Sequence, residues 1–399
     1  MLNFRHHPML ARFLAGFFLQ SAASAILLPL LTLSMAARGV DALLIGSLAT
    51  AGSLAYMAAL PVAPALIARL GGRTTFRATL VLGSLSATGL AASDWPALWV
   101  LLFALAGLAS GVRYTLAESW VPALVTPELR GRAMALFQTS LGAAFFAGSG
   151  ALLLAGGGGP WPRALVVALT LLAAAVLWPM RAPAAEPPVT HTRLGARGLI
   201  ARVGPLVLGA ALLGGIFESG LTVALPLYGM ASGLSPALAA GLVTALGLGS
   251  LAQYPFGYLA DRLPWARVVL GAAALIVATA PLLPLAERWP ALLLLIGVLW
   301  GSAGGGLYTL ATIRNSELWR GPQLVGASVV TQFAYMVGDA AGPALGGLAL
   351  DLAPRLGLPA LVSGAGAAIL AVMFWCELKE GRRAQGLGLK GVAPRQEAL

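Results

Sequence analysis

Long apolar runs alternate with short polar loops along almost the whole chain. A helix that spans a membrane needs about 20 mainly apolar residues, and twelve of the runs are close to that length. Prolines such as Pro29, Pro61 and Pro226 are tolerated in lipid where neighbouring helices satisfy the freed backbone groups. We expect spans at 9–35, 42–68, 75–93, 96–121, 132–156, 163–181, 204–230, 236–260, 268–286, 290–313, 325–350 and 359–377. The pattern predicts an all-α membrane protein with twelve transmembrane helices.

The apolar series is interrupted between the sixth and the seventh run. Residues 181–203 contain Pro183, Pro187 and Pro188 together with several arginines, and no run there is long enough to span. Such a stretch is typical of a linker. We therefore expect an N-terminal six-helix bundle at 1–181, a cytoplasmic linker at 182–203, a C-terminal six-helix bundle at 204–377 and a cytoplasmic tail at 378–399.

The composition agrees with a chain that is solvated mostly by lipid. Hydrophobic residues make up 59% of the 399 residues and charged residues only 10%, whereas soluble domains contain about 25% charged residues. Arginine greatly exceeds lysine, and Ala, Gly and Leu are abundant, which indicates a GC-rich bacterial genome. We therefore expect the membrane to be a bacterial inner membrane.

The basic residues predict how the chain is oriented. The net charge is +11, but the basic residues lie in short loops between apolar runs, which favours a topological signal over a nucleic-acid site. With both termini in the cytoplasm, most of the 25 Lys and Arg residues are cytoplasmic. The exceptions are Arg38, Arg163, Arg288 and Arg355 on the periplasmic side and Arg113 inside a helix. This bias predicts a multi-pass protein with both termini cytoplasmic.

Several kinds of chemistry lack the residues that they need. The single cysteine, Cys376, excludes an intrachain disulfide. His6, His7 and His191 all lie outside the apolar runs, so we expect no buried metal site. The glycine-rich stretches lack a Walker lysine, and no nucleophile–base pair is recognisable. We therefore expect neither an enzyme nor a bound cofactor.

The two halves of the chain resemble each other. Tyr114-Thr115-Leu116-Ala117 recurs 194 residues later as Tyr308-Thr309-Leu310-Ala311. At the same offset Gln138 matches Gln332 and Gly148 matches Gly342. Both copies fall at the same place in the order of the helices. The repeat predicts two parallel halves related by an axis along the membrane normal, which is a known plan for transporters.

A polar loop after the eighth run carries a resemblance to a known family. The loop Gly257-Tyr258-Leu259-Ala260-Asp261-Arg262, followed by Arg267, resembles the signature loop of the major facilitator superfamily. The first-half copy at 64–73 keeps Arg69 and Arg73 but lacks the aspartate, which is a departure from the usual family pattern. The resemblance implies two pseudo-symmetric six-helix bundles and transport of a solute.

A narrower resemblance concerns the fourth, tenth and eleventh runs. Glu118-Ser119-Trp120 with Arg130-Gly131-Arg132, Leu307-Tyr308, and Gly338-x-x-x-Gly342-Pro343 are similar to the YcaD-like subgroup. Because the substrates of that subgroup are mostly unassigned, the resemblance does not name a solute.

We expect the signature loop to act as a cytoplasmic gate. A short carboxylate such as that of Asp261 accepts hydrogen bonds readily from a helix N-terminus. By the repeat symmetry this terminus belongs to the fifth helix, near Gly131. Gly257 would permit close packing of helices. The alternative is a purely topogenic charge cluster. The residues assigned to the gate are Gly257, Asp261, Arg262, Arg267, Arg69, Arg73 and Gly131.

Two carboxyl groups lie within apolar runs of the second half. An ionisable side chain at the bilayer centre costs roughly 2.5–3.5 kcal/mol on insertion scales, so it faces protein or water and is functional by default. Glu218 lies near the middle of the seventh run and is a candidate proton carrier, because desolvation favours its protonated form. Asp339 lies in the eleventh run and could bind a proton or a cationic solute. The alternative for both is a hydrogen bond that only joins two helices.

Arg113 and Glu118 share the fourth run. An arginine cannot become neutral in a protein, so Arg113 needs an anionic partner, a solute anion or water. It is a candidate for the transport path, with a structural ion pair as the alternative. Glu118 lies near the cytoplasmic end, where capping, gating or contact with solute are open possibilities.

Polar and aromatic side chains at similar depths complete a candidate cavity. Trp300 is the tryptophan farthest from both membrane interfaces, and Gln20 lies at a depth comparable to that of Glu218. Packing is the alternative for the aromatic residues. The candidates are Gln20, Tyr114, Gln138, Trp300, Tyr308, Gln332 and Tyr335.

These observations favour a secondary active transporter of a small organic solute that works by alternating access and is coupled to protons. The alternatives are a facilitator without proton coupling and a membrane sensor on a transporter scaffold. The expected partners are membrane lipid, the solute and protons, without nucleic acid, and we expect a monomer. The direction of transport stays open at this point.

Overall fold

The computed structural model describes residues 7–93, 95–126, 129–183, 198, 200, 203–286, 288–319 and 321–386, and this part of the chain is all helical. Several helices begin with proline in their first turn, where its fixed φ and missing N–H cost nothing. The first half consists of α1 (Pro8–Ala36), α2 (Ala42–Leu70), α3 (Gly72–Ala92), α4 (Pro96–Ala123), α5 (Arg130–Leu154) and α6 (Pro160–Leu177).

The second half repeats this order, but three of its spans are divided. The divisions occur at a π-helical turn, at a break before Pro255, and at Pro281 and Pro284. Its elements are α8 (Pro205–Gly214), η2 (Gly215–Gly220), α9 (Leu221–Ala231), α10 (Pro236–Leu251), α11 (Tyr254–Ala260), α12 (Trp265–Thr279), η3 (Ala280–Leu282), α13 (Leu283–Ala286), α14 (Pro290–Leu318), α15 (Gly321–Leu352) and α16 (Gly357–Gly386).

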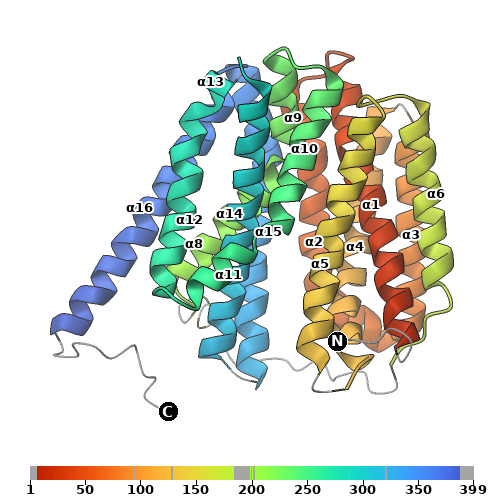
Figure 1. The fold of residues 1–399 in the computed structure, drawn as a ribbon. Helices are drawn as coiled ribbons and strands as arrows, with labels where there is room; N and C mark the ends of the chain where they lie inside the picture. Colours follow the sequence, from red (N-terminus) through yellow and green to blue (C-terminus); the bar gives the residue numbers. More distant parts are fainter. Residues whose placement is uncertain are drawn as a thin grey trace.

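The prediction of an all-α protein with twelve long helical segments is confirmed in the described part of the chain. Ten segments of the described chain are long and apolar enough to cross a membrane by length and composition alone. The other two, α3 and α15, run through the bundle beside them (Figure 1). α15 is rich in glycine and carries two aspartates, which lower its mean hydropathy, and it can be polar because it packs on α2, α8 and η2.

Both described chain ends lie on one side of the molecule, at the bottom of Figure 1. We call this the terminal side and the opposite side the distal side. The two halves meet along two seams, where α2 packs on α15 and α5 packs on α10. Because α2 and α5 of the first half correspond to α10 and α15 of the second, the seams are equivalent under the repeat symmetry.

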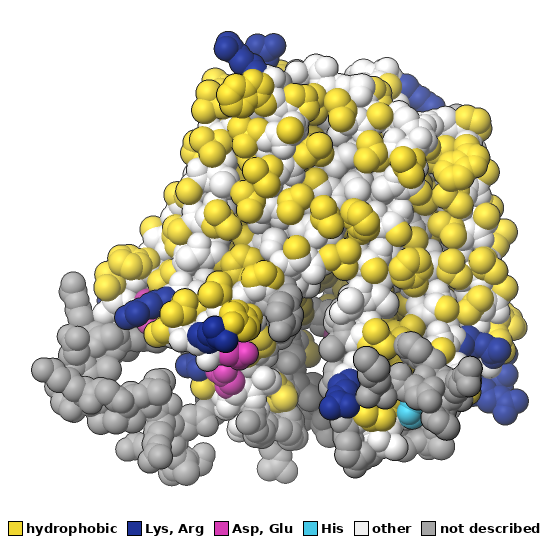
Figure 2. Space-filling model, viewed as in Figure 1, with side chains coloured by type: hydrophobic (Ala, Val, Ile, Leu, Met, Phe, Trp, Pro, Cys, Tyr) yellow, Lys and Arg dark blue, Asp and Glu magenta, His cyan; other side chains and the backbone are white. Residues whose placement is uncertain are grey.

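Among the described residues, the buried apolar cluster that joins the halves lies on the distal side. One buried cluster includes Ile26, Leu30, Leu31 and Leu48 of the first half together with much of the second half. On the terminal side the first half has a separate cluster of its own, which contains Phe13, Phe76, Trp120 and Phe137. Figure 2 shows a hollow between the two lobes at the terminal side. The conformation is therefore closed on the distal side and open on the terminal side.

Exposed apolar side chains cover the flanks of the molecule, as Figure 2 shows. Trp95, Trp161 and Trp289, at helix starts on the distal side, are 66%, 59% and 69% exposed. Tryptophan at such positions anchors a protein at the membrane interface. Trp99 differs, because it is fully buried and its Nε1 donates to the Ser93 carbonyl at 3.1 Å.

The predicted domain boundaries fall partly on residues that the structure does not describe. Most of the expected linker, 182–203, and the end of the expected tail lie outside the described residues. α16 continues past the predicted end of its span at Glu377 as far as Gly386. The polar residues after Glu377 therefore continue the helix beyond its apolar, membrane-spanning part.

Candidate functional site

A π-helical turn places Glu218 between the two halves. η2 occupies Gly215–Gly220, between the α-helical turns of α8 and α9. Its glycines lie so close to α15 that a Cβ on Gly215 would meet the Tyr335 carbonyl oxygen, and one on Gly220 would lie 3.0 Å from the Gly338 carbonyl oxygen. π-Turns inside α-helices occur frequently at functional sites. Here the turn sets the direction of an ionisable side chain.

The Glu218 carboxyl group is hydrogen-bonded on several sides. The Tyr335 hydroxyl donates to Oε2 of Glu218 at 3.1 Å, and Ser250 is a further hydrogen-bonding neighbour. Ser219 Oγ lies 2.8 Å from Tyr335 Oη, and the rings of Tyr308 and Tyr335 are 4.6 Å apart. η2, α10, α14 and α15 therefore all contribute to the surroundings of one carboxyl group.

The opposite oxygen of Glu218 faces a glycine. A Cβ on Gly305 would lie 2.9 Å from Oε1 of Glu218 and 3.0 Å from Oε1 of Gln253. Thr309 Oγ1 donates to the same Gln253 oxygen at 2.8 Å. Gly305 thus leaves open the small space in which these two oxygens meet α14.

Asp339 lies on the seam between the halves rather than inside one bundle. The Ser53 hydroxyl of α2 is hydrogen-bonded to the Asp339 carboxyl group of α15. Next to it, Thr50 Oγ1 donates to the Ala340 carbonyl at 2.6 Å. Asp339 therefore links the two halves directly in this conformation.

The first half presents tyrosines and one carboxyl group toward this cluster. The rings of Tyr56 and Tyr114 are 6.3 Å apart, and Gln138 Nε2 donates to Tyr114 Oη at 2.8 Å. Tyr114 lies within electrostatic range of both Glu118 and Glu218. Glu118 and Gln138 are exposed, Glu118 near the end of α4 and Gln138 farther inside α5. These residues form the wall that faces η2 and α14.

Side chains of each half lie within electrostatic range of side chains of the other half. Tyr308 of the second half lies within electrostatic range of Glu118 in the first half, and Tyr56 lies within that range of Asp339. Tyr56, Tyr308 and Asp339 all keep partial exposure in the middle of long helices. The residues therefore line an accessible cleft that opens toward the terminal side.

Arg113 is buried between α3 and α4, within electrostatic range of Tyr56. Its side chain is 4% exposed. Nη1 donates to the Thr79 carbonyl at 3.1 Å and Nη2 to Ser110 Oγ at 3.3 Å. A Cβ on Gly83 would lie 3.0 Å from Nη1, so that glycine makes room for the guanidinium. Neutral oxygens of the first bundle thus solvate the arginine, where the sequence had suggested an anionic partner, a solute or water.

Among the described residues, no hydrogen bond joins the three remaining cavity candidates to the carboxyl groups. Trp300 is fully buried in the second bundle, where its Nε1 donates to Thr279 Oγ1 at 2.8 Å and its ring packs edge-on against Phe217. Gln20 is 9% exposed on α1, which packs on α5 and α6. Gln332 is partly exposed on α15.

The residues assigned to the cytoplasmic gate are spread over the terminal side. Asp261 follows the last turn of α11 and is exposed, and none of the described residues donates a hydrogen bond to it. The Arg262 guanidinium lies over the Tyr258 ring at 4.0 Å. A Cβ on Gly257 would meet nothing within 4 Å. Arg69, Arg73 and Arg267 are exposed, and Gly131 lies in the first turn of α5.

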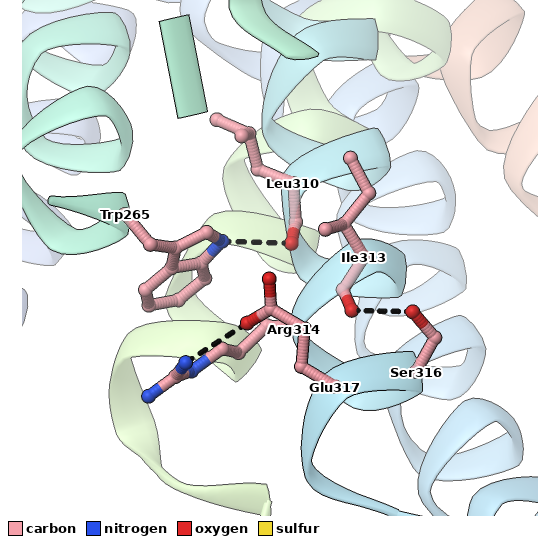
Figure 3. Close-up of polar contacts among 6 residues, drawn as sticks. All are labelled: Trp265, Leu310, Ile313, Arg314, Ser316 and Glu317. Atoms are coloured by element: carbon pink, nitrogen blue, oxygen red, sulfur yellow. Dashed lines mark hydrogen bonds and ion pairs between the residues drawn. The ribbon is translucent and has the colours of Figure 1, made fainter. Parts of the chain in front are cut away.

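Trp265, which follows the loop at the start of α12, contacts α14, as Figure 3 shows. Trp265 Nε1 donates to the Leu310 carbonyl of α14 at 2.9 Å. The Arg314 guanidinium lies 5.4 Å from the centre of the Trp265 ring and pairs with Glu317 at 2.9 Å. The signature loop is thus fixed to α14 while Asp261 stays open to solvent.

The sequence reasoning missed several residues around the carboxyl groups. These are Ser53 and Tyr56 of α2, Ser219 and Ser250, Gln253, and Thr309. One signal was available for Gln253, because it is a polar residue that directly precedes Tyr254-Pro255, where a helix is expected to bend. Serine and threonine carry no comparable signal, since their hydroxyl groups can equally well donate a hydrogen bond to a backbone carbonyl of their own helix.

Comparison with known proteins places these features in a wider context. A family model described as Major Facilitator Superfamily matches residues 13–286, which is more than half of the chain. No curated protein sequence matches the chain. Among solved structures, the nucleoside transporter NupG has a TM-score of 0.71 at 12% identity, covering 92% of this chain and 98% of that one.

Two further solved structures are similar over nearly their whole length. A D-xylose-proton symporter has a TM-score of 0.71 at 15% identity, covering 94% of this chain and 98% of that one. A bacterial homologue of the human lysosomal transporter Spinster, in an inward-facing and occupied conformation, has a TM-score of 0.69 at 15% identity, covering 94% and 92%. At these identities the likeness shows a shared fold.

Proposed function

The chain belongs to the major facilitator superfamily, and from this we propose that it moves a small organic solute by alternating access, driven by a proton gradient. Membership makes it a multi-pass membrane protein and a secondary transporter rather than an enzyme. The solute, the coupling ion and the subgroup are proposals, and we place the chain in the YcaD-like subgroup on its sequence motifs. The halves at 1–181 and 204–377 are the bodies that rock against each other.

The surroundings of Glu218 carry the proposal of proton coupling. A carboxyl group inside a membrane span is costly and is normally part of an ion or proton pathway. Glu218 is held by a π-turn, hydrogen-bonded by Tyr335, and partly exposed to the cleft between the halves. A group with these neighbours is able to take a proton from the cleft and to release it after the halves have moved.

The charges in the cleft support a neutral or cationic solute. Glu118, Glu218 and Asp339 face the cleft, whereas Arg113 is held between α3 and α4. Tyr56, Tyr114, Tyr308 and Tyr335 add aromatic rings, which bind cations through their faces. An anionic solute would meet three carboxyl groups and no basic side chain among these residues. The resemblance of fold to transporters named for nucleosides and D-xylose supports a solute of similar size.

We further propose that the terminal side is cytoplasmic in a bacterial inner membrane, as the distribution of arginines predicts. The conformation described above, open on that side, is then inward-facing. Asp261 has no described hydrogen-bond donor in it. In the opposite conformation, we propose, Asp261 accepts a bond from the start of α5 near Gly131 and holds the cytoplasmic side closed.

A screen followed by a flux assay tests the proposed function. Purified protein is first screened by thermal shift against nucleosides, pentoses and small organic cations, because a ligand that binds the folded state raises its Tm. Each stabilising compound is then followed into proteoliposomes with an imposed pH gradient. We expect concentrative uptake that collapses when the gradient is removed.

Glu218→Gln is the matched variant, since it keeps the shape of the side chain and removes its proton chemistry. We expect it to abolish gradient-driven accumulation while exchange of solute between the two sides continues. Uptake that ignores both the gradient and Glu218→Gln would indicate a facilitator. Binding without any flux in either protein would indicate a sensor.

A further inference from the structure

A carboxylate of one half caps a helix of the other half on the distal side. Asp351 lies in the last turn of α15. Its Oδ1 accepts from the Ala42 amide at 2.9 Å and its Oδ2 from the Leu43 amide at 2.7 Å. These are the first two residues of α2, whose amides have no partner within the helix. A negative charge at this place also interacts favourably with the helix dipole.

The residue that normally caps a helix does not do so here. Asp41 is the N-cap residue of α2, and aspartate is among the preferred residues at that position. Its side chain nevertheless makes no capping hydrogen bond. The cap of α2 comes instead from the second half of the chain, so the bond exists only while the halves are together on the distal side.

The bond lies at the end of a tight seam. A Cβ on Gly347 of α15 would meet the Ala42 carbonyl, and a Cβ on Gly46 of α2 would meet the Pro343 carbonyl. Further along, Thr50 donates to the Ala340 carbonyl. The backbones of α2 and α15 are therefore in contact from the cap toward the centre of the molecule.

The equivalent position on the other seam lacks the acceptor and one of the two donors of these bonds. The repeat offset of 194 relates Asp351 to Gly157 and Pro236 to Ala42. Gly157 has φ +83, and a Cβ there would lie 2.5 Å from the carbonyl carbon and oxygen of Pro236. Gly157 supplies no acceptor side chain, and Pro236 has no amide hydrogen to donate. The seam between α5 and α10 is thus closed at this point by backbone contact alone.

We infer that Asp351 is a one-sided latch of the distal gate, acting on the seam between α2 and α15. The inference rests on the proposed alternating access, because the latch must open whenever the distal side opens. Release costs two charge-assisted hydrogen bonds on one seam and none at the equivalent place on the other. Because the released amides and carboxylate are exposed to water, we expect their loss to shift the conformational equilibrium about three- to tenfold toward the distal-open state.

Spin-label distances across the distal side test this inference without any solute. In a Cys376→Ser background, labels are placed at Leu154→Cys and Leu285→Cys, which lie on opposite halves and are 89% and 65% exposed in the native chain. We expect Asp351→Asn to increase the population with long distances. Ala42→Pro removes one donor and copies Pro236, and we expect the same change of smaller size.

Ala42→Pro also keeps the test valid if Asp351→Asn fails to fold, because the substitution is expected to leave α2 intact. Ala42 is the first residue of α2, where proline is well tolerated, and Asp41 before it already has the extended backbone that proline requires (φ −57, ψ 140). Asp41→Asn is the control, since it removes a neighbouring carboxylate that caps nothing, and we expect unchanged distances.

The outcomes separate the latch from a simple cap. Unchanged distances in Asp351→Asn, with or without a lower Tm, would overturn the latch and leave a helix cap that serves stability. Longer distances in Asp351→Asn and Ala42→Pro, but not in Asp41→Asn, support it. Unchanged distances in Asp351→Asn, together with normal solute uptake by the native protein, refute only the latch. Longer distances in Asp351→Asn, together with no uptake by the native protein, refute only the proposed transport.

Discussion

The hydroxyl group of Tyr335 donates a hydrogen bond of 3.1 Å to Oε2 of Glu218, a residue 117 positions earlier in the chain. The bond joins α15 to the π-turn η2. α15 also forms the seam with α2, so the same helix contacts the carboxyl group and the other half of the molecule. Any movement of α15 relative to η2 therefore changes the surroundings of Glu218.

We predict that Tyr335→Phe impairs transport without impairing the fold. The change removes the donor to Glu218 and the partner of Ser219 but keeps the ring that packs on Tyr308. A hydrogen bond to a charged group contributes about 1.5–3 kcal/mol, so uptake at low solute concentration should fall about tenfold or more. Initial rates in proteoliposomes measure the effect, and an unchanged rate would show that the bond is only structural.

We predict that Gly305→Ala disturbs Glu218 from the opposite side. The added Cβ would lie 2.9 Å from Oε1 of Glu218 and 3.0 Å from Oε1 of Gln253, so the carboxyl group must move. Gly271→Ala is the control, because a Cβ there meets nothing within 4 Å. Alanine in a helix gains about 0.5–1 kcal/mol over glycine, so neither variant should be less stable by more than a small amount. Gradient-driven uptake should fall in Gly305→Ala alone.

We predict that Arg113→Lys lowers stability and leaves solute affinity unchanged. The two bonds, to the Thr79 carbonyl and to Ser110, come from different nitrogens of one guanidinium, and a lysine ammonium does not reproduce that fork. We expect a loss of about 1–3 kcal/mol, seen as a lower Tm. A normal Tm with an altered KM would instead return Arg113 to the transport path.

We predict that Asp261→Asn slows transport but leaves the Tm of the purified protein unchanged. Asp261 is exposed and accepts no hydrogen bond from the described residues in this conformation, so its charge adds little stability here. Its proposed partner is available only when the terminal side closes. Glu317→Gln is the control on the same side, since Glu317 pairs with Arg314 within α14. Equal uptake in both variants would support a purely topogenic role for the loop.

The sequence predicted the structure best where a type of side chain is stable in only one kind of environment. A long apolar run must be surrounded by lipid or protein, and this predicted the spans and the break after Arg181. The repeat was predicted from identical residues at a constant offset of 194. A carboxyl group in such a run must face something polar, which singled out Glu218 and Asp339. Their neighbours Ser53, Ser250 and Tyr56 were not found, because hydroxyl groups are common in helices that have no function.

Arg113 shows where this reasoning stops. Its burial was predictable, but the direction of its side chain was not, since Thr79 and Ser110 satisfy it as well as a solute anion would. Trp300 is a similar case, because its partner, Thr279, lies inside the second bundle and could not be predicted from the sequence.

The sequence by itself determined that the chain is a helical membrane protein of two repeated halves with carboxyl groups at depth, because hydrophobic periodicity and the cost of burying charge act locally along the chain. Only the tertiary structure decided which side of the cleft is closed and that η2 turns Glu218 toward Tyr335. It also decided that Asp351 caps α2 on one seam, whereas Gly157 meets Pro236 on the other. These relationships depend on how distant helices pack, and many arrangements of backbone contact are compatible with the same apolar pattern.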